Sequence, residues 1–423
     1  MRAYANSNIR RNWRTPATGR NLLRQSQEGQ KDIKKRARRQ SAFGCVILWA
    51  MLHYFSSFLE TVWGPFRLLR SHAWLLAVGT LLAAFAVVFL LPKLWAFLPH
   101  DHGKAILGKD GMKSAGKPTS AGLWVTLLVL PIVLLVTPLT WAEGGVLFFL
   151  YLAMMCGFLD DRSEVPWGQL KKGLLDCVAS LGVAACLYWN QGGEVWLPFV
   201  KGVWSVPWWL YVPGAGFLLF VVMNATNCSD GVDGLAGSLT LISLVFLAAL
   251  LYLVVGYAPV ARYLLVPMNP AGARWAILLM TVAGGFAGYL WWNAEPSKVL
   301  MGDAGSRFLG LLLGAGVLVT GNPLLILAFA PVVLVNGGGG MVKILLLRFF
   351  RKCGLDVRPP SMLPPEALGR RNVLVRLVQC VRFPLHDHCK KELKWSNAQV
   401  LMRFMLLQTF LMPLIFVLFV KIR

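Results

Sequence analysis

Long apolar runs, separated by short polar segments, make up most of the chain from residue 73 onward. A helix needs about 20 mostly apolar residues to cross the ~30 Å hydrocarbon core of a bilayer. Ten runs of this kind occur, at 73–98, 120–139, 143–159, 169–188, 207–226, 238–256, 273–293, 307–320, 322–348 and 399–421. The pattern therefore predicts an all-α, polytopic integral membrane protein with about ten transmembrane helices.

Two of the ten runs differ from a plain span. The eighth is short, and the ninth contains Asn336 followed by the four glycines at 337–340. Glycine weakens a helix and lets neighbouring backbones approach closely inside a membrane. We expect a kink in the ninth helix at these residues.

The apolar segment 43–63 precedes the first clean span and is open to two interpretations. It contains His53, Ser56, Ser57 and Glu60, and it ends before a break at 64–72. Such a segment either crosses the bilayer or lies along its surface as an interfacial helix, and we favour the surface. The predicted organisation is thus a basic arm at 1–42, an interfacial or spanning helix and linker at 43–72, and a ten-helix transmembrane domain at 73–423.

Composition supports the membrane assignment. Apolar residues make up 57% of the 423 and charged residues 14%, against roughly 45–50% and 25% in soluble domains. The eight cysteines are scattered and form no CxxC pair. No disulfide framework is implied.

Positive charge is concentrated at the start of the chain and in particular loops. The net charge is +23, and residues 1–40 hold 12 basic and 2 acidic residues with few large apolar ones. This arm is predicted to be disordered, and it lacks the residue pattern of a cleavable signal peptide. Basic segments beside a membrane bind anionic headgroups with about 1 kcal/mol per Lys or Arg, so membrane lipid is the expected partner and nucleic acid is not.

The loops between the runs differ sharply in charge. One alternate set carries 20 Lys and Arg and the other set carries 3. The positive-inside bias places the basic set in the cytoplasm. That set comprises the loops at 99–119, 160–172, 227–237, 294–307 and 348–398. We therefore expect a multi-pass protein of the inner (plasma) membrane, with both ends of the ten-helix core on the outer face.

A polar island at 224–238 lies between two apolar runs. Its notable side chains are Asn224, Asn227, Asp230 and Asp233. Ionisable groups at a membrane edge are costly unless paired or hydrated, which favours a functional site. The alternative is an ordinary helix cap by Ser229 or Asp230, but one residue suffices for a cap and four polar residues are present.

Three further stretches share the cytoplasmic side. Residues 113–122 bring Lys113, Lys117 and Thr119 with Gly-rich backbone, which suits phosphate, although a basic loop can also be a plain membrane anchor. The pair Asp160 and Asp161 ends one span, and 301–306 carries Asp303 between glycines. Carboxylates gathered at one interface repel each other, and Mg²⁺ would relieve the repulsion. Together with Lys and Gly loops they indicate phosphoryl transfer from a nucleotide-linked donor.

The last large loop contains His386, His388 and Cys389. Their spacing fits no common zinc pattern and lacks an evident fourth ligand. A pair of imidazoles in a basic loop better fits diphosphate binding. An ordinary solvated loop remains the alternative.

In this order the stretches resemble the polyprenyl-phosphate N-acetylhexosamine-1-phosphate transferase superfamily. The resemblance runs from about His53 to the last span, through motifs at 118–122, 160–161, 224–236, 293–294, 301–306 and 384–388. The last motif, before a terminal span, is similar to that of the phospho-N-acetylmuramoyl-pentapeptide transferase family. The resemblance implies transfer of phospho-N-acetylmuramoyl-pentapeptide from its UDP derivative to undecaprenyl phosphate, with Mg²⁺ as cofactor and release of UMP, at an active site on cytoplasmic loops. It leaves a homodimer open.

The resemblance also implies roles. Asp303 would be the metal ligand, with Asp230 as a second one. Asp160 and Asp161 would position or deprotonate the lipid phosphate, and these two with Asp303 form the catalytic set. Substrate-binding residues would be Lys113, Lys117, Thr119, Asn224, Asn227, Asp230, Asp233, His386 and His388.

Some positions depart from the family pattern. Leu300 stands where an aromatic residue would stack on uracil, and the other departures are Lys117 for Thr, Glu164 for Lys, Asn336 for Glu and Asp387 for His. An N-acetylglucosamine-1-phosphate transferase is therefore the alternative enzyme, and an inactive membrane scaffold is the alternative of another class. A transporter is disfavoured because no inverted repeat of short broken helices is evident.

Overall fold

The computed structural model describes residues 51–101, 115–165, 167–198, 200, 202–358 and 372–421. The predictions for the basic arm at 1–42 and for Lys113 concern residues outside these ranges. The segment 43–63 is described only from residue 51, so whether it crosses the membrane stays a prediction.

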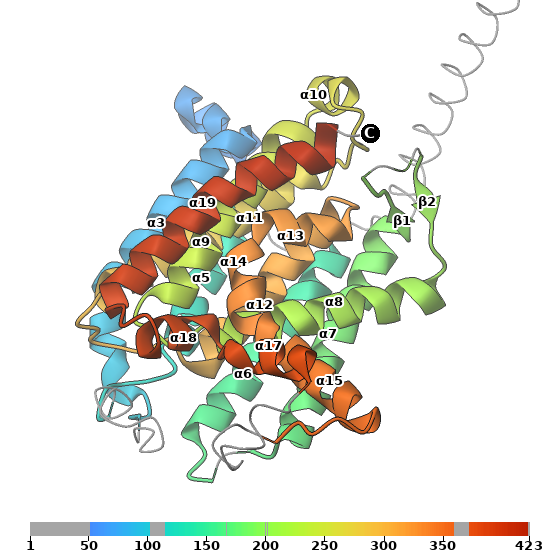
Figure 1. Cartoon of the computed structure of the whole chain (residues 1–423). Coiled ribbons are helices and arrows are strands. Elements are labelled where there is room, and N and C mark those ends of the chain that lie inside the picture. The colour runs from blue at the N-terminus through green and yellow to red at the C-terminus, as the bar shows by residue number, and fades with distance from the viewer. Residues whose placement is uncertain are drawn as a thin grey trace, which may run out of the picture. The chain divides into compact units, whose positions relative to one another are not determined.

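The predicted all-α class is confirmed (Figure 1). The first half of the chain forms α2 (Met51–Val62), η1 (Gly64–Arg70), α3 (His72–Leu94), η2 (Trp95–Phe97), α5 (Gly122–Val136), α6 (Trp141–Arg162), α7 (Gln169–Gln191) and α8 (Trp208–Cys228). Strands β1 (Glu194–Val195) and β2 (Trp204–Ser205) pair antiparallel between α7 and α8, with Glu194 opposite Ser205.

The second half is also helical. It forms α9 (Leu235–Leu250), the π-helix η4 (Leu251–Val255), α10 (Ala258–Tyr263), α11 (Gly272–Asn293), α12 (Gly302–Val319), η5 (Pro323–Leu325), α13 (Ile326–Phe329), α14 (Pro331–Val333), the π-helix η6 (Leu334–Gly338), α15 (Gly339–Lys352), α17 (Val373–Cys380), α18 (Leu385–Lys391) and α19 (Asn397–Lys421).

Eight helical segments among the described residues are long and apolar enough to cross a membrane. They are His72–Phe97, Trp141–Arg162, Trp208–Cys228, Leu235–Val255, Gly272–Asn293, Gly302–Val319, Pro331–Lys352 and Asn397–Phe419. The other two predicted spans are helices as well. Helix α5 is short, at 15 residues, and the 23-residue α7 includes Lys171, Lys172 and Asp176, which lower its apolar character.

Helix α12 lies at the centre of the helical core (Figure 1). About nine-tenths of its length is buried, against about a quarter for α3 and α19. It packs against α5, α6, α7, α8 and α9, and α11 in turn packs on α3, α5 and α9. Gly310 of α12 faces Met223 and Thr226 of α8 so closely that a side chain there would overlap them. Small residues allow this close packing inside a membrane, where apolar burial alone drives little association.

The ninth span is interrupted, as the glycines at 337–340 predict, but the interruption is longer than expected. The chain leaves helical geometry at Ala330, with φ −134° and ψ 40°, and then passes through the π-helical turn Leu334–Gly338. A Cβ at Gly337 would overlap the backbone of Ala225 in α8, and one at Gly339 would overlap the ring of Phe383. The glycines therefore let α8 and the 383–388 loop approach this turn.

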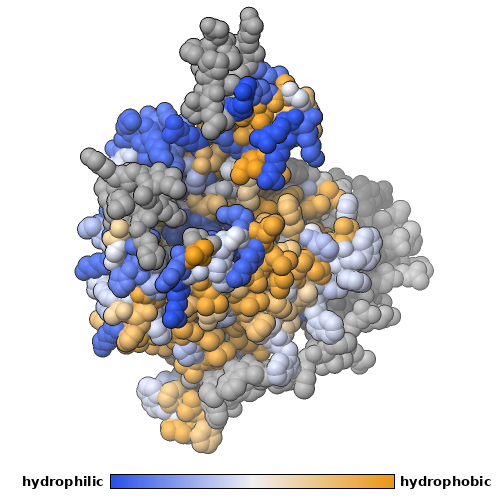
Figure 2. All heavy atoms as spheres, turned by 90° about the horizontal axis from the view of Figure 1, so that it is seen from below, coloured by the Kyte–Doolittle hydropathy of each residue, from blue (hydrophilic) through white to orange (hydrophobic). Residues whose placement is uncertain are grey.

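The start of α5, the start of α12 and the end of α6 meet one another. The start of α5 contacts the start of α12, because Gly122 lies against the backbone of Gly305, and near the end of α6 Gly157 lies against the backbone of Asp303. The loop before α5 pairs with the loop before α12 through Leu300 N–H donating to Pro118 O at 2.8 Å. Figure 2 views the lower side of Figure 1 and shows hydrophilic residues gathered there around a hollow.

Candidate active site

Asp160 is a buried carboxylate at the end of α6, with 5% of its side chain exposed. Its Oδ1 accepts a hydrogen bond from the Trp167 N–H at 3.0 Å. Its Oδ2 lies 2.5 Å from Nζ of Lys172, at the start of α7. Both oxygens thus have partners within the protein.

Asp161 joins three segments. Its Oδ2 accepts hydrogen bonds from the Ser120 hydroxyl and from the Asp303 backbone N–H at 2.9 Å. Asp303 lies in the first turn of α12, where backbone N–H groups lack intrahelical partners and negative charge is favourable. The turn into this helix is made by Gly302 at φ +69°. Asp161 therefore caps α12 from the neighbouring helix α6.

Asp303 is the most accessible carboxylate of this group, with 27% of its side chain exposed. Its Oδ2 accepts from Nη2 of Arg307 at 2.9 Å. The structure gives no hydrogen bond to the other oxygen, Oδ1, within the described part of the chain. One oxygen is thus held by the protein while the carboxylate remains open to solvent.

A buried cation that sequence reasoning missed lies behind these carboxylates. Arg307 has 3% of its side chain exposed, and its Nη1 contacts Asp176 of α7 at 2.6 Å. Its Nη2 lies 3.9 Å from Asp160. Two signals were present in the sequence: Arg307 follows Asp303 at the i,i+4 helix spacing, and Asp176 and Lys172 are charged residues in a predicted span.

The polar island is a loop between α8 and α9 rather than a helix cap. Helix α9 begins at Leu235, and its N-cap is Gly234 at φ +77° without a side-chain cap. The alternative of Ser229 or Asp230 as N-cap is therefore wrong. Asn293, at the end of α11, holds the loop by accepting from the Gly234 N–H at 2.8 Å and donating to Val299 O at 2.8 Å.

Several predicted residues of the island meet predicted residues of other loops. Ser306 of α12 donates to Oδ1 of Asn227 at 3.0 Å. Nζ of Lys117 donates to Oγ of Ser297 at 2.9 Å and lies 3.8 Å from Asp233. The motifs at 118–122, 224–236 and 301–306 therefore lie close together.

Other predicted residues take local roles. Asn224 donates to Phe220 O in its own helix at 3.0 Å. Thr119 donates its backbone N–H to Pro99 O at 2.8 Å. Asp230 is partly buried in the same loop as Asp233.

His386 is buried and contacts the island, whereas His388 forms a hydrogen bond within its own loop. The backbone N–H of His386 donates to Oδ1 of Asn336 at 2.9 Å, and its Nδ1 lies 3.1 Å from the same oxygen. Because that oxygen only accepts, Nδ1 carries the hydrogen and Nε2 is an acceptor. Burial lowers the pKa of His386 to about 4, so the ring is neutral near pH 7. Nδ1 of His388 accepts from the Arg382 N–H at 3.4 Å.

The donor set decides which metal fits. Among the residues described here, no group of three or more His, Cys, Asp or Glu is arranged to hold a metal. Mg²⁺ takes only one or two carboxylates and completes its shell with water and substrate phosphates. The accessible Asp303 fits such a site.

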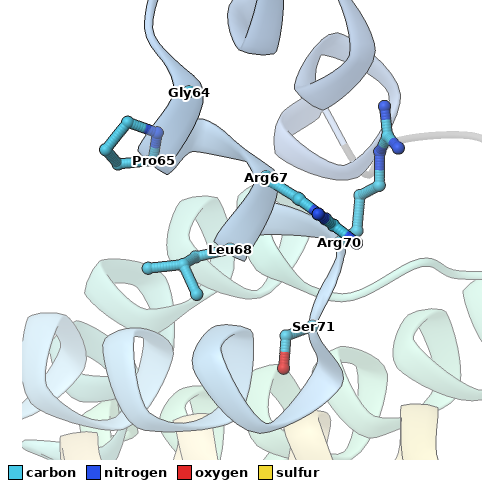
Figure 3. Close-up of a pocket in the computed structure, with 6 residues that line it drawn as sticks. All are labelled: Gly64, Pro65, Arg67, Leu68, Arg70 and Ser71. Atoms are coloured by element: carbon cyan, nitrogen blue, oxygen red, sulfur yellow. The ribbon is translucent and has the colours of Figure 1, made fainter.

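A surface pocket lies elsewhere, on η1 and the start of α3. Figure 3 shows its lining by Gly64, Pro65, Arg67, Leu68, Arg70 and Ser71. Arg70 is paired with Glu60 at 2.6 Å. The 23 residues of α3 separate this pocket from the loop at 99–101 by roughly 35 Å at 1.5 Å per residue, so it is not part of the site.

Comparison with known proteins agrees with these motifs. Residues 144–321 match glycosyl transferase family 4. The chain is 41% identical over 356 residues to a phospho-N-acetylmuramoyl-pentapeptide-transferase of Treponema pallidum, covering 83% of this chain and 91% of that protein.

More distant relatives carry the same name. One from Desulfotalea psychrophila is 28% identical over 365 residues, covering 82% of this chain and 93% of the relative. Another, from Borreliella burgdorferi, is 27% identical over 359 residues, covering 80% and 93%. On this identity and coverage, the chain belongs to the phospho-N-acetylmuramoyl-pentapeptide transferase family.

Proposed function

We propose that this protein transfers phospho-N-acetylmuramoyl-pentapeptide from UDP-N-acetylmuramoyl-pentapeptide to undecaprenyl phosphate and releases UMP, the first membrane step of peptidoglycan synthesis. The observation that carries the proposal is the accessible Asp303 carboxylate at the start of α12, held by Asp161 and Arg307. It lies where the loops at 118–122 and 224–236 converge. The family membership supports the same reaction.

We assign the metal to Asp303, with Asp230 as a second ligand. A bound Mg²⁺ would neutralise the phosphates of donor and acceptor, which otherwise repel each other. This assignment is supported by the exposure of Asp303 and by the small number of protein ligands that Mg²⁺ requires.

The protein side chains have separable tasks in this proposal. Asn224, Asn227, Asp233, Lys117, Thr119 and Lys113 bind the nucleotide and its phosphates. His386 is neutral near pH 7 and its Nε2 is an acceptor, so it accepts a hydrogen bond from a hydroxyl of the sugar rather than binding the diphosphate by charge. His388 supports the loop that carries it.

The transfer is a direct displacement. An oxygen of undecaprenyl phosphate forms a bond to the β-phosphorus of the donor, the bond from that phosphorus to the bridging oxygen breaks, and UMP leaves. Asp160 and Asp161 position the acceptor phosphate or take its proton. Lys172 and Ser120 hold these two carboxylates at the end of α6, so their placement does not depend on the substrate.

The location of the site suits a soluble donor and a lipid acceptor. The motif loops belong to the set that carries 20 of the 23 Lys and Arg counted between the spans. The positive-inside bias supports placing them on the cytoplasmic face of the plasma membrane. There the lipid phosphate reaches the site laterally at headgroup depth.

An N-acetylglucosamine-1-phosphate transferase remains the second candidate. The observation that favours it is Leu300, whose backbone bonds fix it between Pro118 and Ala121 where an aromatic residue was expected to stack on uracil. An inactive scaffold is disfavoured because all five motif carboxylates are present.

Release of UMP by the purified protein tests the proposal. UDP-N-acetylmuramoyl-pentapeptide with undecaprenyl phosphate and Mg²⁺ should yield UMP and a lipid diphosphate product, and EDTA should stop the reaction. UDP-N-acetylglucosamine is the matched donor control. UMP released only from that second donor would establish the alternative enzyme, and release from neither donor would favour the scaffold.

A further inference from the structure

Arg307 is the cation at the centre of the carboxylate cluster. Its guanidinium lies 2.6 Å from Asp176 on α7, 2.9 Å from Asp303 on its own helix and 3.9 Å from Asp160 on α6. With Lys172, it sets two fixed positive charges against three carboxylates. The guanidinium is 3% exposed, so solvent screens these interactions weakly.

The guanidinium of Arg307 is held by carboxylates on two sides. Its Nη1 is bound to Asp176, and its Nη2 is then directed to Oδ2 of Asp303. A guanidinium is planar and permanently charged, so it holds two carboxylates in a fixed relation that the single ammonium of lysine does not reproduce. Moving it away would leave the buried carboxylate of Asp176 without its cationic partner, which is costly.

We propose that Arg307 is a positioning residue for the transfer reaction: it holds one oxygen of Asp303, orients the carboxylate toward the metal, and lowers the negative charge that the metal meets. This rests on the proposed function, since it assigns Arg307 a role at the same site. Arg307 thereby weakens metal binding somewhat, but it fixes the orientation of the ligand Asp303. A purely structural role would affect stability and leave the metal site unchanged.

The positioning role can be told apart from a purely structural role, because removing Arg307 should strengthen metal binding and at the same time lower turnover. Loss of the positive charge near Asp303 strengthens the attraction of the carboxylates for a divalent cation. Loss of the hydrogen bond frees the carboxylate to rotate, which lowers turnover because a misplaced group costs reactivity. General damage to the fold would weaken both metal binding and turnover.

The test compares wild type with Arg307→Met, Arg307→Lys and the control Arg274→Met, each as full-length protein in detergent. Arg274 pairs with buried Glu143 at 3.1 Å at the far end of α6. Like Arg307, it leaves its Nε without a hydrogen-bond partner within the described residues. Mn²⁺ binding is measured by electron paramagnetic resonance with UMP present and no turnover. UMP release gives kcat and KM, and thermal unfolding reports stability.

Arg307→Met should lower kcat at least tenfold, change the donor KM by less than about threefold, and tighten Mn²⁺ binding at least about threefold. Arg307→Lys should keep wild-type Mn²⁺ affinity because it retains the positive charge. It should lower kcat because an ammonium group does not hold Asp176 and Asp303 together in a fixed relation. Arg274→Met should leave kcat and Mn²⁺ affinity within twofold while lowering the unfolding temperature.

Mn²⁺ binding that is unchanged or weaker in Arg307→Met would overturn the inference, as would a kcat within threefold of wild type when the wild-type enzyme is active. A wild type that binds no Mn²⁺ would overturn it too. If wild type releases no UMP from either donor, the proposed function fails instead, and the Mn²⁺ titration alone decides the role of Arg307.

Discussion

The imidazole ring of His386 lies against Gly231 so closely that a Cβ at position 231 would overlap Nε2. On its other side the ring is bonded to Asn336 in the π-helical turn. The ring therefore fills the space between the ninth span and the polar island. The late histidine loop therefore packs against the same island that carries Asp230 and Asp233.

Replacing Gly231 with alanine should therefore disturb the site directly. The added methyl meets Nε2 of His386, and the bonds to Asn336 prevent the ring from retreating. We expect kcat/KM for UMP release to fall at least tenfold, with little loss of expression. Gly214→Ala is the control, because nothing lies within 4 Å of a Cβ there. Equal activity of the two variants would contradict the observed contact.

Protonation of His386 should make the protein less stable in acid. Burial lowers the pKa of the ring from 6.5 to about 4, and Asp387 offsets this only in part. Between these values the unfolded chain binds a proton that the folded chain does not, so stability falls as pH drops through the window. Below about pH 4 both states are protonated and the loss stops. The contribution is about 3 kcal/mol across the window.

Thermal unfolding of wild type and His386→Gln in detergent, from pH 7.5 to 4, measures this effect. Glutamine retains an N–H for Asn336 but does not titrate in this range. The unfolding temperature of wild type should therefore fall more steeply between pH 6.5 and 4 than that of the variant. Parallel curves would show that His386 does not stay neutral in the fold.

Asp303→Asn should abolish turnover. The amide keeps the shape of the side chain, but a hard divalent cation binds a neutral amide far more weakly than a carboxylate. UMP release should fall by more than a hundredfold, and binding of undecaprenyl phosphate should survive. Asp356→Asn serves as the control, because Asp356 pairs with Arg358 on an exposed loop. Activity of Asp303→Asn within tenfold of wild type would remove the metal assignment.

No covalent phospho-enzyme should form on Asp160 or Asp161. Both oxygens of Asp160 have protein partners, and Oδ2 of Asp161 caps α12. Attack through either oxygen of Asp160, or through Oδ2 of Asp161, would break these bonds. Intact-protein mass spectrometry after donor is added without lipid should therefore show unmodified enzyme. A phosphosugar adduct on either Asp would replace direct displacement with a double displacement.

Much of this architecture is readable from sequence, because each span must satisfy its own backbone and so needs only a long apolar run. The meeting of 118–122 with 301–306 was also predictable, since both segments adjoin loops of the set that is richer in Lys and Arg, which the positive-inside bias predicts to share one side of the membrane. The pairing of Arg307 with Asp176 was not. It depends on α7 packing beside α12, and apolar runs do not specify which helices are neighbours.

The contacts around Asn336 also could not be predicted in full from the sequence. The glycines after it predicted an interruption of the ninth helix, and a π-helical turn is present. Their sequence does not reveal that Gly339 makes room for Phe383, nor that Asn336 accepts from His386. Those contacts join residues 336–339 of the ninth span to residues 383–386, which follow them by more than 40 positions, and they follow from tertiary packing alone.

Gln408 should stabilise the break in the ninth span. Buried in α19, it donates to Phe329 O at 2.9 Å and accepts from the Val332 N–H at 3.0 Å, which are backbone groups beside the non-helical Ala330. Gln408→Leu leaves both without these bonds in apolar surroundings, at a cost of about 1–3 kcal/mol. The unfolding temperature in detergent should fall clearly, whereas Thr409→Val, which alters an exposed hydroxyl bonded within its own helix, should change it little. Similar unfolding temperatures for the two variants would mean that water or lipid satisfies the break without Gln408.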